Sequence, residues 1–315
     1  MRNRSKNINI FLMDGEVIGR IKCTLSNWIG VIYKIPRIQL NKLRGRQELK
    51  QSGIYFLFGK DDERQKDVTY IGQATSRKNG EGVLFRVQEH TRDSHSDYFN
   101  DVIILTTQNN SFGPTEISYL ENRFTNLAKE TGRFIVKNGN EPNLGNVTEE
   151  KKSELDEVVE NAIIIIGTIG YKLFVPMVTK SELGNIGEKA DTKIFYLNRK
   201  SKKSNTTIQA TCKRTTEGFV VLKGSMVELM DSPKIPAVIK KMRKDLQEAG
   251  IIKEGILQEN QLFNSPSYAA AFILDMHTNG RTDWKAFPSK KYLAPDCVKT
   301  IFFLNTDTLK APIII

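Results

Sequence analysis

The sequence predicts an α/β (α+β) protein, because short apolar runs alternate with amphipathic segments of helical length through residues 51–176. The predicted strands are SGIYFLFG at 52–59, VTYIGQA at 68–74 and DVIILTT at 101–107, and the predicted helices span 83–92, 115–131 and 149–166. A polar turn joins the first two strands, so they form a hairpin. The order β-β-α-β-α with one further helix predicts a small domain with a short sheet between helices.

Capping residues support two of these helices. Thr115 can cap the helix over 115–131, and Ser118 with Glu121 three residues later is a second candidate with capping-box spacing. Thr148 is expected to cap the helix over 149–166, which has acidic residues in its first turns.

The segment before this domain, residues 1–50, is predicted to be a small β-hairpin followed by a helix. Alternating runs at 8–12 and 17–25 flank the turn residues Asp14 and Gly15. Pro36 is expected to break any strand in its neighbourhood, and 38–51 is expected to be a basic helix.

The segment after it divides into a polar linker over 177–192 and a basic α+β domain over 193–315. Its predicted strands are 193–198, 207–214 and 218–225, and its predicted helices are 236–250 and 268–278. We expect Trp284 to lie in the core of this domain.

Composition excludes several classes of protein. Of 315 residues, 39% are hydrophobic and 26% are charged, which is typical of a globular chain and not of a disordered one. The longest apolar run, 162–170, is too short to span a bilayer, and the N-terminus lacks the apolar core of a signal peptide. The three cysteines form no pair with zinc-ligand spacing, so we expect no zinc site and a reducing, cytoplasmic location.

The net charge of +11 favours an anionic partner, and it is distributed unevenly. Residues 1–50 carry 11 Lys/Arg against 3 Asp/Glu, and residues 190–255 carry 14 against 7. Residues 51–174 carry 14 against 19 and are therefore acidic. If the partner is nucleic acid, the basic flanks are expected to supply most of the phosphate affinity.

One ordered set of residues in the middle segment carries chemistry. Gly53-Ile54-Tyr55 and Tyr70-Ile71-Gly72 stand on the two strands of the predicted hairpin. Arg86 and His90 are four residues apart on the next helix, so they share one helix face. Glu121 follows on the second helix, and Asn138 comes shortly after that helix. Any one of these residues alone is more typical of a core strand or a solvated surface.

Together and in this order, the residues resemble the motif of the GIY-YIG nuclease family over about residues 53–143. The resemblance implies a small domain with a mixed or antiparallel three-stranded sheet flanked by helices. The 14 residues between Tyr55 and Tyr70 exceed the usual interval of the family. The additional residues are polar and fall in the turn, where insertions are tolerated.

The resemblance also implies roles for these residues. Glu121 would hold Mg²⁺, with Mn²⁺ as an alternative, because Mg²⁺ accepts one or two carboxylates and keeps several waters. Arg86 would neutralise charge on the phosphate, Tyr70 would act as general base, and Tyr55 would position water or phosphate. His90 would assist proton transfer, or else cap its helix, and Asn138 completes the set.

The C-terminal segment resembles a domain of unknown function that is often fused behind GIY-YIG domains, on LKGS at 222–225, SPSYAAAFIL at 265–274 and NGRTDWK at 279–285. It has basic residues interleaved with aromatic ones, a pattern typical of nucleic-acid binding and equally of a basic solvated sheet. The candidate nucleic-acid-binding residues are Lys200, Lys202, Lys203, Lys213 and Arg214, with Arg199 beside them.

Three functions are compatible with the sequence. The first is a metal-dependent endonuclease that hydrolyses phosphodiester bonds in DNA while the basic flanks hold the substrate. The second is a nucleic-acid-binding module that does not cleave and uses the same fold as a phosphate-binding surface. The third, a basic adapter for acidic proteins or membrane surfaces, accounts for none of the motif residues.

Overall fold

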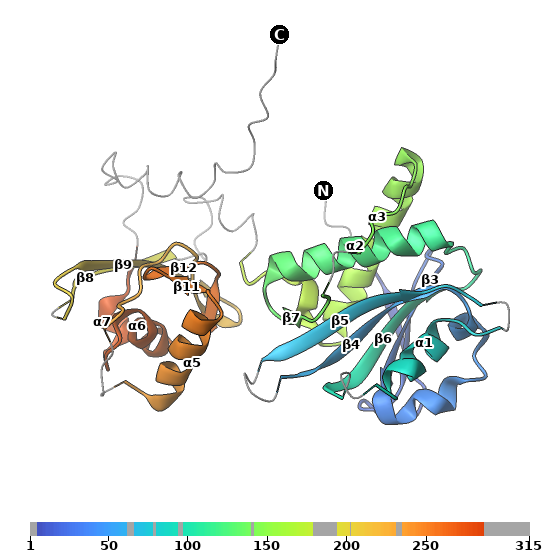
Figure 1. Ribbon diagram of the computed structural model, residues 1–315, viewed down its shortest axis with the longest axis horizontal. Coiled ribbons are helices and arrows are strands. Elements are labelled where there is room, and N and C mark those ends of the chain that lie inside the picture. The colour runs from blue at the N-terminus through green and yellow to red at the C-terminus, as the bar shows by residue number, and fades with distance from the viewer. Residues whose placement is uncertain are drawn as a thin grey trace, which may run out of the picture. The chain divides into compact units, whose positions relative to one another are not determined.

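The computed structural model divides the chain into two compact units, Met1–Pro176 and Met177–Ile315, and each has its own sheet and helices (Figure 1). It describes residues 5–61, 66–77, 80–93, 97–139, 142–178, 194–201, 203–230 and 235–286. The predicted α/β class is confirmed, since helices and several sheets occur along the chain.

The first unit is built on one seven-stranded sheet with the order β1-β2-β3-β6-β4-β5-β7. The strands are β1 Ile8–Leu12, β2 Ile21–Leu25, β3 Gly30–Pro36, β4 Gly53–Lys60, β5 Asp67–Ala74, β6 Phe99–Thr107 and β7 Ile135–Val136. Neighbouring strands are antiparallel except β5 and β7, which are parallel. The predicted hairpin of β4 and β5 and the third strand β6 form the side of the sheet that carries the motif residues.

The N-terminal segment joins this sheet. The predicted hairpin of β1 and β2 is present, and β3 connects it to β6 through pairs that run from Gly30 with Thr107 to Pro36 with Asp101. The expectation that Pro36 prevents a strand here was wrong, because Pro36 is the last residue of β3. At that position its missing N–H removes no bond from the interior of the ladder.

The expectation of one helix over 38–51 was also wrong. Two 3₁₀ helices replace it, η1 Arg37–Leu43 and η2 Gln47–Lys50. Gly45 lies in the break between them, and glycine is unfavourable inside a helix because it loses the most backbone freedom. The buried residues of these two turns, Leu40, Leu43 and Leu49, anchor them against the sheet.

Helices cover both faces of the sheet (Figure 1). On one face, Ile54, Phe56 and Phe58 of β4 pack with α2 Pro114–Thr131, α3 Glu149–Thr168 and η4 Lys172–Phe174. On the other face, Tyr55 and Leu57 pack with α1 Val83–His90 and the two 3₁₀ helices. Successive residues of a strand alternate between faces, so β4 is buried on both sides.

The N-termini of α2 and α3 differ in their capping. Thr148 caps α3 as predicted, because its side chain accepts a hydrogen bond from the Lys151 N–H. The predicted caps of α2 were wrong, because α2 begins at Pro114 after Gly113, with no side-chain cap. Proline suits the first helical position, where its missing N–H would have no partner in the helix.

The outer edge of β5 is only partly paired by a neighbouring strand. Among the described residues, β7 pairs with β5 at Val68 and Thr69, and the Lys137 N–H donates to the Thr69 carbonyl (2.8 Å). The Asn138 side chain then replaces a strand, since its Oδ1 accepts from the Ile71 N–H (3.1 Å) and its Nδ2 donates to the Ile71 carbonyl (2.7 Å). These contacts fix the backbone on both sides of Tyr70.

The second unit has a five-stranded antiparallel sheet with the order β13-β10-β9-β8-β14 and a two-stranded sheet of β11 and β12. The strands are β8 Ile194–Lys200, β9 Thr207–Thr215, β10 Gly218–Val221, β11 Ile252–Lys253, β12 Ile256–Leu257, β13 Gln261–Phe263 and β14 Lys285–Ala286. The helices are α5 Ala237–Glu248, α6 Pro266–Leu274 and α7 Gly280–Asp283. Trp284 is buried and donates to the Pro266 carbonyl, which confirms it as a core residue.

No described helix of either unit has both the length and the apolar content that a membrane span requires.

Gly72 decides how tightly the strands of the motif can pack. An added Cβ at Gly72 would lie 2.4 Å from the hydroxyl of Tyr55, whose ring crosses the ladder at this point. We predict that Gly72→Ala lowers the free energy of unfolding by about 1–3 kcal/mol, because the overpacked ring must move. Urea denaturation measures this change. Gly45→Ala, with open space around Gly45, is the matched control and should change stability much less.

Candidate active site

The predicted site residues Tyr55, Tyr70, Arg86, His90 and Glu121 come from β4, β5, α1 and α2. Tyr55 lies on β4, and Tyr70 lies on β5 opposite Leu57, so both tyrosines point to the face covered by α1. Arg86 and His90 lie on α1, one turn apart. The ring centroids of Tyr55, Tyr70 and His90 are 5.4 to 6.2 Å from one another.

A hydrogen bond of 2.8 Å joins the Tyr55 hydroxyl to Nε2 of His90. Burial raises the pKa of Tyr55, and its nearness to Tyr70 adds to this effect. Burial lowers the pKa of His90, and the positive charge of Arg86 acts in the same direction. Near neutral pH the phenol is therefore protonated and the imidazole is neutral, and the hydroxyl donates to Nε2 in the tautomer that carries its proton on Nδ1.

Tyr70 is half-buried at the same place. Burial raises the pKa of Tyr70, and the carboxylate of Glu121 adds to the increase. Arg86 and a hydrogen bond with the Tyr55 hydroxyl act in the opposite direction and stabilise the phenolate. The two phenols and the imidazole thus form a connected series of proton donors and acceptors.

Arg86 is held beside the tyrosines by an ion pair. Its Nη1 donates to Oε2 of Glu89 at 2.8 Å, within one turn of α1. The guanidinium lowers the pKa of both Tyr55 and Tyr70, and it contributes a side-chain hydrogen bond to Tyr55. This placement leaves Arg86 43% exposed, so a phosphate can reach it from solvent.

Glu121 reaches the site from α2, which packs on the opposite face of the sheet. A hydrogen bond with Gln73 of β5 lowers the pKa of its carboxyl group. Burial has the larger effect and raises the pKa of Glu121. A half-buried carboxylate of this kind gains from a neighbouring cation, because the cation compensates for lost hydration.

These donors fit a hydrated divalent cation. Within the described parts of the chain there is no group of three or more His, Cys, Asp or Glu side chains that could hold a metal ion. A single carboxylate, with waters in the remaining positions, satisfies the coordination habit of Mg²⁺. Glu121 is the side chain that would hold it, as the sequence predicts.

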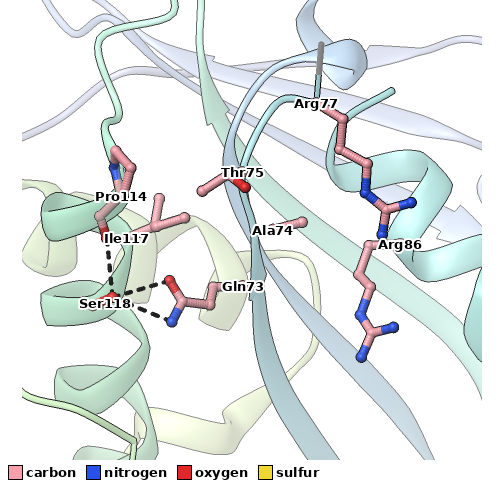
Figure 2. A pocket seen from close by; sticks show the side chains of 8 residues that line it. All are labelled: Gln73, Ala74, Thr75, Arg77, Arg86, Pro114, Ile117 and Ser118. Atoms are coloured by element: carbon pink, nitrogen blue, oxygen red, sulfur yellow. Dashed lines mark hydrogen bonds between the residues drawn. The ribbon is translucent and has the colours of Figure 1, made fainter. Parts of the chain in front are cut away.

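Among the predicted site residues, Arg86 lines an open hollow of about 350 Å³, and Tyr55, Tyr70, His90, Glu121 and Asn138 are not in its lining (Figure 2). It is lined by Gln73, Ala74, Thr75, Arg77, Arg86, Pro114, Ile117 and Ser118. Arg77 and Arg86 stand on one side of the end of β5, and the hydrogen-bonded pair of Gln73 and Ser118 stands on the other (Figure 2). Arg86 is therefore accessible from solvent through this hollow.

Asn138 lies at the same edge and contacts the β5 backbone. Its amide bonds to both backbone groups of Ile71, next to Tyr70. This geometry suits a residue that positions Tyr70, whereas direct participation of Asn138 in catalysis stays a prediction.

The basic residues predicted to bind nucleic acid divide into four groups, the last of which is the buried Lys213. Lys200 and Arg214 are exposed. Arg199 pairs with Asp283 at 3.0 Å, and Lys203 pairs with the buried Asp275 at 2.8 Å, so both already have anionic partners in the unit. Lys202 lies outside the described residues.

The expectation that Lys213 lies on the surface was wrong, since its exposed fraction is 0%. Lys213 pairs with Ile194 and Val220 in the middle of the sheet, between β8 and β10. Its neighbour Arg214 points to the opposite face, because side chains alternate along a strand.

Gln73, Arg77, Glu89 and Ser118 line or organise the hollow, and none of them stands out in the sequence. Gln73 follows Gly72 directly, and Glu89 lies between the two helix residues of the motif, so proximity to the motif was the available signal. Arg77 lies in the loop after β5, and only the tertiary structure places it beside Arg86.

Comparison with known proteins is informative for the second unit. Residues 201–293 match the family described as Domain of unknown function (DUF4357). The second unit therefore contains a domain of unknown function, as the sequence predicts. No curated protein matches this chain, and no solved structure matches it.

The pKa of His90 provides a test of this geometry. Because burial and Arg86 lower it, we predict that the His90 imidazole titrates below the ordinary value of about 6.5 in an NMR titration. The folded state then binds this proton less readily than the unfolded state, so stability falls as pH drops from about 6.5 toward the lowered value. The same imidazole in the urea-unfolded protein serves as the reference. An ordinary titration of His90 would contradict the buried, hydrogen-bonded placement.

Proposed function

We propose that this protein is a metal-dependent endonuclease of the GIY-YIG type that hydrolyses phosphodiester bonds in DNA. The observation that carries the proposal is the meeting of Tyr55, Tyr70, Arg86, His90 and Glu121 beside one strand edge. Residues separated by up to 66 positions in the sequence contribute complementary groups to one place. These are proton acceptors, a cation and a carboxylate, the groups that phosphodiester hydrolysis requires.

Three proton transfers occur in one step. Tyr70 accepts the proton of the attacking water and gives its own proton to the Tyr55 oxygen, and Tyr55 gives its proton to Nε2 of His90. The 2.8 Å contact between Tyr55 and His90 and the 6.2 Å separation of the two phenol rings support this order. A neutral imidazole at the end of the series makes the transfer feasible, since neither phenol has to ionise alone.

Arg86 acts on the charge that develops at phosphorus. Its guanidinium presents donors in a planar fork that matches phosphate oxygens, and it carries a full charge at every working pH. In the absence of phosphate the same charge favours the anionic forms of both tyrosines. Arg86 therefore stabilises the phosphorane and the anionic forms of the two phenols, while the same charge lowers the pKa of His90 and weakens it as the final proton acceptor.

Glu121 holds the divalent cation, Mg²⁺ or Mn²⁺. The bound ion would supply electrostatic stabilisation for the phosphate oxygens and for the departing oxygen. Gln73 orients the Glu121 carboxylate through its hydrogen bond, so it serves as a positioning residue.

The basic parts of the chain hold the substrate in this proposal. The first unit combines the basic residues 1–50 with the acidic segment 51–174, and together they carry 25 Lys/Arg against 22 Asp/Glu. This small excess gives weak attraction for a polyanion. The second unit adds exposed Lys200 and Arg214, which makes it the stronger candidate for non-specific DNA affinity.

Cleavage is tested with a supercoiled plasmid and with duplex, branched and single-stranded oligonucleotides, in Mg²⁺ or Mn²⁺. We expect nicking that is abolished by a chelator and reduced on the order of 10²–10³-fold by Glu121→Gln, which removes the charge of the carboxylate. The matched control is Glu130→Gln on the exposed part of the same helix.

Equal rates for wild type and Glu121→Gln would refute the site assignment. Tight, salt-sensitive DNA binding without cleavage on any substrate would instead support the alternative function, a binding module that uses this fold as a phosphate-binding surface.

The contribution of the second unit is tested by a double substitution, Lys200→Gln with Arg214→Gln. We predict weaker DNA binding and a decrease of about two in the slope of log K against log salt, because each lost phosphate contact removes roughly one. Fluorescence anisotropy at several salt concentrations measures both quantities. Arg199→Gln, which removes an arginine whose Nη1 contacts both Thr278 and Asp283, is the comparison and should lower the slope by less than the double substitution does.

A further inference from the structure

We propose that Arg77 is a second phosphate-binding residue, which takes a backbone phosphate next to the one that Arg86 contacts. The proposal deepens the proposed nuclease function and rests on it for the identity of the ligand as a polynucleotide strand. No part of the sequence motif includes Arg77, which lies in the loop between β5 and α1.

The position of Arg77 relative to Arg86 is the first support. Both guanidiniums line the same hollow, and they enter it from the same side of β5 (Figure 2). Their side chains are 45% and 43% exposed, so both are open to a ligand from solvent.

Glu89 shows what kind of group fits between the two arginines. Its Oε1 accepts from Nη1 of Arg77 at 3.1 Å, and its Oε2 accepts from Nη1 of Arg86 at 2.8 Å. One carboxylate thus accepts hydrogen bonds from both guanidinium groups. A phosphate presents oxygen acceptors of the same charge and similar spacing. Nη1 of Arg77 also lies 3.5 Å from Oε2 of Glu81, and since each guanidinium has five N–H donors, the two carboxylates leave donors of the pair for a phosphate.

Arg77 is also fixed in place more firmly than an ordinary surface arginine. Its backbone N–H donates to the Glu81 carbonyl, and its carbonyl accepts from the Gly80 N–H, so both backbone polar groups of Arg77 are hydrogen-bonded. Its guanidinium lies 5.2 Å from the centroid of the Phe85 ring. A side chain held in this way loses little further conformational freedom when it binds an anion.

The distribution of charge around the hollow indicates which side of it the phosphates of a bound polynucleotide would follow. Both cationic lining residues stand on the α1 side, whereas the α2 side presents Pro114, Ile117 and Ser118. The phosphates would therefore follow the α1 side, past Arg77 and Arg86, and the sugars and bases would face α2.

The test compares Arg77→Gln with Arg123→Gln. Arg123 has the same 45% exposure and also pairs with a carboxylate, on α2 beside Asp156. Binding of a fluorescent DNA duplex is measured in EDTA, without turnover, over a series of salt concentrations. We expect Arg77→Gln to weaken binding several-fold and to lower the salt slope by about one, whereas Arg123→Gln leaves the slope unchanged.

Cleavage gives a second measurement. In single-turnover reactions with Mg²⁺, Arg77→Gln should raise the half-saturating DNA concentration more than it lowers the maximal rate, and Arg86→Gln should mainly lower the maximal rate. Arg77→Lys keeps the charge and loses the fork, so it should fall between wild type and Arg77→Gln. Because it is the milder change, it also provides the measurement if Arg77→Gln does not fold.

The outcomes separate the two proposals. A salt slope for Arg77→Gln equal to that of wild type or of Arg123→Gln overturns the role of Arg77, even when wild type cleaves DNA. A wild type that fails to cleave, together with a lower slope for Arg77→Gln, refutes the nuclease and keeps the phosphate site.

Discussion

The arrangement of the candidate site depends on one close contact, the passage of the Tyr55 ring over Gly72 within the ladder of β4 and β5. Because position 72 has no side chain, the ring can pass close to the neighbouring strand, and its hydroxyl reaches Nε2 of His90. That bond connects the sheet to α1, and Tyr70 is held beside it by the same register. A larger residue at position 72 would separate the phenol from the imidazole.

The partly uncovered edge of β5 is the second feature on which the site depends. Pairing with β7 continues only through Thr69, and the Asn138 amide substitutes for a strand at Ile71. Beyond that point the strand edge lies beside the hollow, and Glu121 from one face can approach tyrosines that belong to the other. A complete neighbouring strand would satisfy the backbone of β5 and would block this approach.

The net charge of the first unit is small, so its attraction for an anion depends on individual charged side chains. Its basic N-terminal segment, residues 1–50, adds β1, β2 and β3 to the sheet of the acidic segment, so the net charges of the two segments largely offset each other. Affinity for a polyanion then depends on individual cations such as Arg86 and Arg77, which Glu89 brings together. In the second unit, by contrast, several basic side chains have internal partners, and only some of them remain for an external anion.

Local sequence determined much of this protein. Alternating apolar runs gave the strands, helical spacing placed Arg86 and His90 on one face, and Thr148 marked the start of α3. Tertiary structure alone decided that Pro36 ends a buried strand, that Lys213 lies inside its sheet and that Arg77 reaches Glu89. The physical reason is the range of the interactions. Periodicity and capping act within a few residues, whereas burial and ion pairs depend on which distant segments pack together.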